Sequence, residues 1–131
     1  MTRREIRENI FKMLFRIEFH EKGEMPEQFS MYEEELSRAD EEDLRYINEK
    51  VQNIVEHLEE IDASINEVAE GWKTTRMGKV DLTLIRLAVY EIRYEEDIPF
   101  KVSVNEAVLL AKKYGGDGSS VFVNGILAKY A

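Results

Sequence analysis

Apolar residues recur every three or four positions along the first segment of the chain, a spacing typical of one face of an α-helix. The stripe consists of Ile6, Ile10, Leu14 and Ile17. Thr2 and Glu5 precede it with the spacing of a capping box, in which the threonine hydroxyl and the glutamate carboxylate each accept a backbone amide at the helix end. We therefore predict a first helix that starts at Thr2 and stops near residues 21–23, where a glycine is the expected terminator.

The next three helices are predicted from their boundary residues. A short helix should follow Pro26, because proline suits the first helical turn. Asp40 is a good N-cap for a third helix that runs to about Glu60, with further acidic side chains in its first turn. Asp62 can cap a fourth helix, which should end near Gly71.

Residues 80–92 differ from these amphipathic segments, because nine of the thirteen are apolar and lie all around a helix. Such a pattern predicts a central helix that its neighbours cover. Arg86 and Glu91 lie within it. An unpaired charge in a protein interior costs several kcal/mol, so we expect each of the two to have a partner or to reach the surface.

After Pro99 interrupts the chain, Ser103 opens a second capping box and a helix that should run to Tyr114. A glycine-rich turn at residues 115–120 can end in an N-cap serine, and a last helix should cover residues 121–130. Six or seven helices with short connections predict an all-α bundle. The chain has only two prolines and seven glycines, which agrees with that class because a many-stranded sheet needs more turn residues.

The composition places the chain among globular proteins. With 131 residues, 44% of them apolar and 34% charged, it suits one core and one domain, residues 1–131. No apolar run approaches the roughly 20 residues of a membrane span, and the N-terminus lacks the apolar stretch of a secretory signal, so we expect no membrane partner. The absence of cysteine is consistent with a cytoplasmic location.

The net charge is −9, but the acidic excess lies in one part of the chain. Residues 17–70 carry four basic and eighteen acidic side chains. By contrast, residues 1–16 carry five basic and two acidic side chains, and residues 71–131 carry nine basic and seven acidic ones. Such asymmetry suggests a binding face for an anionic partner outside the middle segment. The acidic middle segment itself is explained by solubility.

The sequence gives no support for catalysis. His20 and His57 stand alone on acidic helices, with no cysteine to join them. Glu56, Glu59 and Glu60 could hold a divalent ion, but solvated helix charge explains them better. The glycine turn lacks the lysine and the preceding strand of a phosphate-binding P-loop. We expect a protein that is not an enzyme and that uses no metal or cofactor.

Arg3, Arg4 and Arg7 are the first candidate binding element, because their spacing of three and four residues places them on one helix face. Guanidinium groups bind phosphate through paired donors, which suits a nucleic-acid backbone. The alternative is that these arginines pair with Glu5 and Glu8 on the same helix.

The glycine turn and its flanks are the second candidate element. A helix N-terminus presents free amides and a partial positive charge to phosphate, and the three glycines allow a ligand to approach the backbone. Tyr114 and Phe122 flank the turn as rings on which unpaired bases can stack. Lys112 and Lys113 add positive charge. Alternatively, the glycines serve only the turn and the rings belong to the core.

Several runs of the sequence together strongly resemble the NusB family of bacterial transcription antitermination factors. They are residues 84–92, 98–99, 104–108, 111–115 and 122–127, in this order. The arginine-rich first helix and the segment from Trp72 to Arg76 are also similar to that family, and the resemblance is weakest across residues 23–60. It implies an all-helical fold of two packed helical halves that acts as a single RNA-binding domain.

The resemblance also implies a function. It leads us to expect binding to boxA, a short single-stranded element of ribosomal RNA transcripts, and a heterodimer with NusE, a small-subunit ribosomal protein. That pair joins the other Nus factors on RNA polymerase and suppresses termination, so the polymerase is an indirect partner. Members occur as monomers and as homodimers, and the sequence does not decide between the two states.

The positions that the resemblance assigns to RNA fall on the two elements already described. With Lys113 added for its charge, the candidate RNA-binding residues are Arg3, Arg4, Arg7, Lys113, Tyr114, Gly118, Ser119 and Phe122. Position 118 is an aspartate in some relatives, where it can cap the last helix and touch RNA. Gly118 can make that contact only through its backbone.

The resemblance places the NusE surface on Phe15 and Phe19, four residues apart on the first helix, and on Asp81 at the start of the central helix. Core packing is the alternative for the two phenylalanines. Two other functions stay open: an RNA-binding module of a ribosomal RNA methyltransferase, and a helical protein–protein adaptor without RNA. The lack of a cysteine nucleophile counts against the methyltransferase, and the arginine face counts against the adaptor.

Overall fold

The described chain consists of helices joined by short connections. The computed structural model describes residues 1–20, 22–36 and 39–131, and no strand occurs among them. Its α-helices are α1 (Arg3–Phe15), α2 (Met25–Glu35), α3 (Glu41–Glu56), α4 (Leu58–Val68), α5 (Lys79–Tyr94), α6 (Phe100–Tyr114) and α7 (Ser119–Ala128). They form two compact units, residues 1–55 and 56–131. The predicted all-α class and the division into two helical halves are confirmed.

The predicted capping box at the start of α1 is confirmed. The Thr2 hydroxyl accepts the Glu5 amide at 3.1 Å, and the Glu5 carboxylate accepts the Thr2 amide at 3.1 Å. The Thr2 amide bond to the carboxylate lowers the pKa of Glu5, because it favours the charged form. The end of α1 was predicted too late. The helix stops at Phe15 and continues as a 3₁₀ turn over Arg16–Phe19, a common tightening of a last turn.

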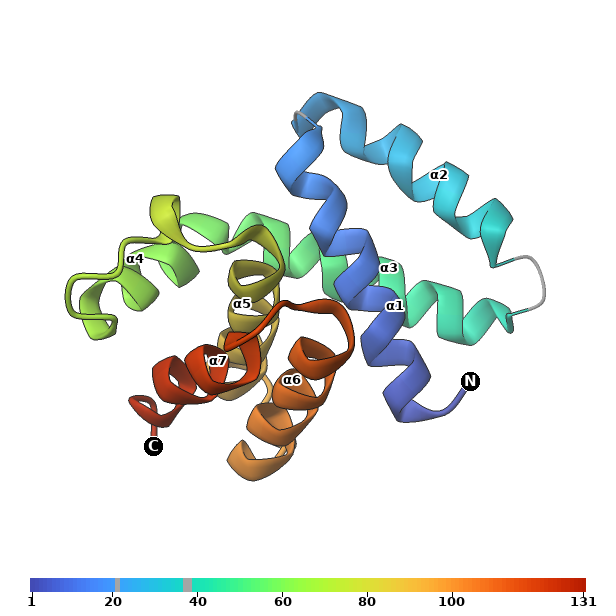
Figure 1. Cartoon of the computed structure of the whole chain (residues 1–131). Coiled ribbons are helices and arrows are strands. Elements are labelled where there is room, and N and C mark those ends of the chain that lie inside the picture. The colour runs from blue at the N-terminus through green and yellow to red at the C-terminus, as the bar shows by residue number, and fades with distance from the viewer. Residues whose placement is uncertain (21, 37–38) are drawn as a thin grey trace. The chain divides into compact units, whose positions relative to one another are not determined.

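In the unit of residues 1–55, the chain turns back after α1 so that α2 returns beside it (Figure 1). Residue 21, near which the first helix was predicted to stop, lies outside the described residues. The predicted second helix is confirmed, but it begins at Met25, one residue before Pro26, which lies in its first turn. The amino group of Met1 also lies 3.0 Å from the Asp43 carboxylate on α3.

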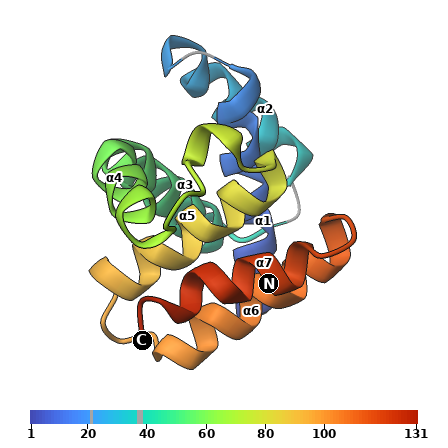
Figure 2. The same cartoon turned by 60° about the vertical axis from the view of Figure 1, so that its left-hand side comes forward.

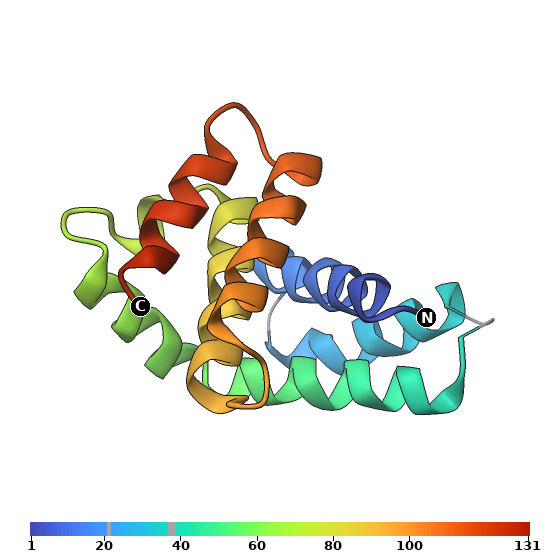
Figure 3. The same cartoon turned by 90° about the horizontal axis from the view of Figure 1, so that it is seen from below.

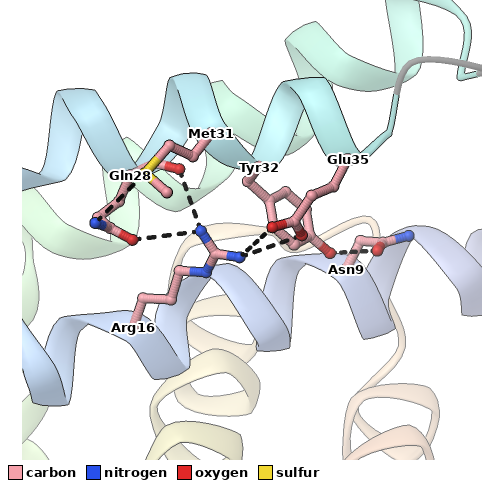
Figure 4. Close-up of polar contacts among 6 residues, drawn as sticks. All are labelled: Asn9, Arg16, Gln28, Met31, Tyr32 and Glu35. Atoms are coloured by element: carbon pink, nitrogen blue, oxygen red, sulfur yellow. Dashed lines mark hydrogen bonds and ion pairs between the residues drawn. The ribbon is translucent and has the colours of Figure 1, made fainter.

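Arg16 fastens α2 to the end of α1. Its guanidinium lies 3.2 Å from both carboxylate oxygens of Glu35, and it donates to the backbone and side-chain oxygens of Gln28 (Figure 4). The same group lies 5.0 Å from the ring centre of Tyr32, whose hydroxyl donates to Asn9 on α1. Because its guanidinium group is planar and has several donors, the single side chain of Arg16 contacts Gln28, Tyr32 and Glu35 along α2.

The third and fourth helices divide earlier than predicted. The Asp40 carbonyl accepts the Leu44 amide at 3.0 Å, in agreement with the predicted start of α3. However, α3 ends at Glu56, and α4 already begins at Leu58. The ring of His57, between the two helices, packs 4.6 Å from the ring centre of Tyr94.

Asp62 was wrongly predicted to cap the fourth helix, because it lies inside α4. Its carboxylate instead accepts two bonds of 2.8 Å from Arg86 on α5. Arg86 thus has the partner that its position required. The other charge of the central helix, Glu91, is 1% exposed and accepts the Ser103 hydroxyl at 2.8 Å. Both expectations for the charges of α5 are confirmed.

The second predicted capping box is wrong. Pro99 holds the N-cap position, with extended backbone, and α6 begins at Phe100, so Ser103 lies one turn inside the helix. Ser103 is 1% exposed, and its hydroxyl serves Glu91 rather than a helix end. The proline starts the helix early because its fixed φ suits the residue before a helical turn.

In the unit of residues 56–131, α5 is the central helix and is confirmed as such. Its fully buried apolar side chains include Leu84, Ile85 and Val89. Helices α6 and α7 lie side by side with α5 next to both (Figures 1 and 2). The Ser64 hydroxyl of α4 lies 2.8 Å from the Tyr130 hydroxyl beyond the end of α7. Across the described residues, none of the helices has the length and apolar character that a bilayer crossing requires.

Candidate nucleic-acid interface

A tight loop connects α6 to α7 and extends beyond the ends of both helices (Figure 3). Gly115 ends α6 by donating its amide to the Ala111 carbonyl at 2.8 Å. A Cβ atom at Gly115 would lie 2.5 Å from the Cβ and Oγ of Ser119 and 2.7 Å from the Ala111 carbonyl oxygen. Real Cβ atoms do not make such short contacts, so only glycine fits at this position.

The other end of the loop differs from the prediction. Gly118, with a φ of +84°, is the N-cap of α7, and no side chain caps this helix. The predicted N-cap serine is therefore wrong, and α7 begins two residues earlier than expected. The Ser119 hydroxyl instead accepts the Gly116 amide at 3.1 Å, while the Ser119 amide donates to the Gly116 carbonyl at 3.2 Å. A left-handed glycine turns the chain directly into the helix, so no side-chain cap is needed.

Aromatic and basic side chains surround this loop. Tyr114 and Phe122 are both half-buried, and Lys113 is exposed, with its ammonium group 5.4 Å from the ring centre of Tyr114. The first turn of α7 carries no acidic side chain. Ser119 is 8% exposed, and both its hydroxyl and its amide bond to Gly116 within the loop. The structure thus brings the five candidate residues Lys113, Tyr114, Gly118, Ser119 and Phe122 to one end of the α6–α7 pair.

Phe122 has a neighbour that the sequence did not indicate. Its ring meets that of Trp72 edge to face, with ring centres 5.5 Å apart and an angle of 73° between the planes. Trp72 lies in the connection between α4 and α5 and is 58% exposed. No helical or strand spacing relates two positions so distant in sequence. The sequence marked Trp72 only as the single tryptophan of the chain and as the start of a segment similar to the family named above, and neither signal indicated its contact with Phe122.

The arginine element lies in the first two turns of α1. Arg3 and Arg4 are exposed, and Arg7 is half-buried. Of the acidic neighbours considered as their partners, Glu5 accepts the Thr2 amide, and the Glu8 carboxylate lies 3.7 Å from the Lys12 ammonium. The structure therefore assigns a role in helix capping to Glu5. The three arginines belong to residues 1–55 and the glycine loop to residues 56–131, so each unit carries one candidate element.

The residues predicted to bind NusE differ in how far they are exposed. Phe11 is buried. The ring centre of Phe15 lies 5.9 Å from that of Phe11 and 5.2 Å from that of Phe19. Phe19 is 58% exposed, so core packing does not account for it, whereas Phe15 is half-buried. Asp81, in the other unit, lies half-buried in the first turn of α5.

Two of the groups considered for catalysis or metal binding have other contacts. His20 lies 3.5 Å from the Glu24 carboxylate, and Glu60 accepts the Tyr94 hydroxyl at 2.8 Å. The latter bond raises the pKa of Tyr94, because the carboxylate favours the protonated phenol. Within residues 1–20, 22–36 and 39–131, no three histidine or carboxylate side chains group together as a metal ion would require.

Comparison with known proteins identifies close relatives. The sequence model of the NusB family matches residues 4–131. The transcription antitermination protein NusB of Agathobacter rectalis is 61% identical over 131 residues, which are the whole of both chains. That of Lachnoclostridium phytofermentans is 54% identical over 129 residues, or 98% of each chain.

Solved structures agree with these sequence matches. The structure of T. maritima NusB has a TM-score of 0.89 and 36% identity, and the match covers 100% of this chain and 91% of that one. A structure of the antitermination factors NusB and NusE in complex with dsRNA has a TM-score of 0.84 and 29% identity, covering 98% and 94% of the two chains.

Proposed function

The chain belongs to the NusB family, and we propose that it is a transcription antitermination factor that binds boxA RNA of ribosomal RNA transcripts together with NusE. The observation that supports this most strongly is the family match over residues 4–131, joined to a relative of known structure that holds both NusE and RNA. Residues 1–131 then act as one RNA-binding domain. The action on RNA polymerase, with the other Nus factors, follows from membership of the family.

Two kinds of contact hold the RNA in this proposal. Arg3, Arg4 and Arg7 bind backbone phosphates, because guanidinium groups match phosphate oxygens with paired donors. Tyr114 and Phe122 accept unpaired bases by stacking, and the backbone of the glycine loop approaches the strand closely. Single-stranded segments suit this arrangement, since their base edges and faces are accessible.

NusE binds to Phe15, Phe19 and Asp81 in this proposal. The exposure of Phe19 supports it, because a ring that is 58% exposed leaves a large apolar area for a partner to cover. A basic ribosomal protein also supplies positive charge to a chain whose net charge is −9. We therefore expect weak RNA binding by the chain alone, and strong dependence on salt.

The proposed role requires no catalysis and no cofactor, and its site of action is the cytoplasm, where RNA polymerase works. The alternative of a methyltransferase module has less support, because the relatives described above are antitermination proteins along their whole length. The alternative of a protein–protein adaptor predicts that the protein does not bind boxA in preference to other RNA, and a binding experiment can decide between the two.

Filter binding with three RNAs tests the proposal: a single-stranded boxA oligonucleotide, a scrambled strand of the same composition, and boxA annealed to its complement. Each is titrated with the protein alone and with an equimolar mixture of protein and NusE. We expect the mixture to bind boxA several-fold more tightly than the protein alone does, and more tightly than it binds the scrambled strand. Equal affinity for boxA and the scrambled strand contradicts the proposal, and preference for the duplex contradicts its single-stranded form.

A further inference from the structure

Trp72 is a large aromatic side chain held at the surface without an assigned role. It is 58% exposed, although tryptophan is buried to a high degree in most folded proteins. Exposed aromatic rings gather at sites that bind partners, because they offer a large apolar face at little cost in conformational entropy. The position of Trp72 next to Phe122 suggests what that partner is.

The backbone around Trp72 is fixed by local bonds. Gly71 adopts a φ of +91°, so the chain turns sharply before the tryptophan. The Trp72 amide donates to the Ala69 carbonyl at 3.3 Å, and the Thr74 amide donates to the Asn66 side chain at 2.8 Å. The indole is therefore presented from a defined turn rather than from a loose loop.

The geometry of the two rings decides how they can meet a base. Their centres are 5.5 Å apart and their planes are inclined by 73°, so no base can insert between Trp72 and Phe122. The two rings are instead inclined to each other, so each presents a separate face on which a base could stack. Because the contact is edge to face, it leaves the indole largely exposed, and a second base can stack there while a first stacks on Phe122.

The charge of the same segment favours an anionic strand as the occupant. Residues 71–80 carry three basic side chains and no acidic one, in a protein of net charge −9. Lys73 and Arg76 of this segment are exposed. The nearest acidic residue in the preceding turn, Glu70, lies 3.3 Å from the Lys129 ammonium, which offsets its charge. Aromatic rings flanked by basic side chains are the arrangement by which proteins bind single-stranded nucleic acid.

We propose that Trp72 is a second base-stacking position for single-stranded RNA, adjacent to Phe122, and that Lys73 and Arg76 contact the phosphates of the same nucleotides. This inference rests on the proposed function and extends its RNA surface from the α6–α7 loop to the connection between α4 and α5. It adds at least one nucleotide to the bound segment.

Trp72 is the only tryptophan, so its emission reports on this position alone. The protein is titrated with single-stranded boxA RNA while tryptophan fluorescence is recorded, and the anisotropy of labelled RNA is measured in parallel. We expect the emission to be quenched with the same midpoint as the rise in anisotropy, because a stacked base contacts the indole directly. A rise in anisotropy with unchanged emission overturns the inference and leaves the proposed function intact.

Substitutions give a second readout. We expect Trp72→Ala to weaken RNA binding about tenfold, and Trp72→Phe to restore most of the affinity because it keeps an aromatic face. Leu109→Ala is the control, since Leu109 is another exposed apolar residue of the same unit and is 43% exposed. Circular dichroism verifies that the helical content is unchanged.

The outcomes separate the two claims. Wild-type affinity of the Trp72→Ala variant overturns the inference alone. Loss of NusE binding with unchanged RNA binding also overturns it, because it makes the tryptophan a protein contact. If the unaltered protein binds no RNA, with or without NusE, the inference fails together with the proposed function.

Discussion

Replacing Gly115 with alanine should destabilise the unit of residues 56–131 by about 1–3 kcal/mol, the usual cost of forcing extra atoms into a packed site. The new methyl group would lie 2.5 Å from Ser119 and 2.7 Å from the Ala111 carbonyl oxygen. The contacts with the Ser119 Cβ atom and with the Ala111 carbonyl oxygen are difficult to relieve, because neither atom can move by rotation of a side chain. The start of α7 must therefore move away from the end of α6.

Gly116→Ala is the matched control, one residue further along the same loop. A Cβ atom there meets nothing within 4 Å, and Gly116 does not adopt a positive φ. We expect a change in stability within about 0.5 kcal/mol. Urea unfolding followed by circular dichroism measures both variants. Equal midpoints for the Gly115→Ala variant and the unaltered protein would show that the loop does not close as described.

The same pair of variants separates loop shape from loop flexibility in RNA binding. If the position of α7 matters for contact with RNA, Gly115→Ala weakens boxA binding even under conditions in which the variant is fully folded, whereas Gly116→Ala does not. This follows because Phe122 and the Ser119 backbone move together with the start of α7. Both variants remove one glycine, so the loss of backbone freedom is the same in each.

Replacing Arg3, Arg4 and Arg7 together with alanine should weaken boxA binding roughly 100-fold at low salt. This estimate takes about 1 kcal/mol for each exposed phosphate contact, after allowance for solvent screening. Each phosphate contact on a single strand also contributes about 0.7 to the slope of log affinity against log salt. The triple variant should therefore bind with a slope about 2 units shallower, and at high salt the two proteins should converge.

A control variant removes the same charge elsewhere. Arg45, Arg93 and Lys101 are exposed basic residues on α3, α5 and α6, and none belongs to a candidate binding element. Replacing all three with alanine changes the net charge by the same amount as the arginine variant does. If both triple variants lose affinity equally, overall charge rather than the first turns of α1 controls binding, and the proposed role of the arginines is wrong.

The existence and order of the helices could be predicted from the sequence, because apolar spacing marks the buried face of a helix, and residues such as Pro26 and Asp40 mark where a helix begins. The capping box of Thr2 and Glu5 was also readable, since all of its partners lie within four residues. The central position of α5 followed from apolar residues on all its sides. Local patterns thus sufficed for these features.

Two predicted helix caps failed for one physical reason. Asp62 and Ser103 both have the short polar side chains that favour N-caps. In the structure, however, they bond to Arg86 and Glu91, respectively. A cap contributes only about 1 kcal/mol, less than the cost of leaving a buried charge such as Glu91 without a partner. The tertiary partner therefore prevailed at both positions. The serine cap predicted for α7 failed for another reason, because the left-handed Gly118 turns the chain into the helix without a side-chain cap.

The candidate site likewise has one part that the sequence predicts and one part that it does not. The shared face of Arg3, Arg4 and Arg7 follows from helical spacing alone. The contact between Trp72 and Phe122 does not, because it depends on how the connection after α4 folds next to α7. Sequence separation hides such a pair, whereas the structure shows it directly.

We propose that one RNA strand contacts both the first turns of α1 and the α6–α7 loop. An NMR titration of the isotope-labelled protein with single-stranded boxA RNA measures this residue by residue. We predict that the amide resonances of residues 3–7 and of residues 114–122 shift together, with a single apparent dissociation constant. Shifts confined to one of these two groups, or two groups that titrate with different constants, would contradict the account.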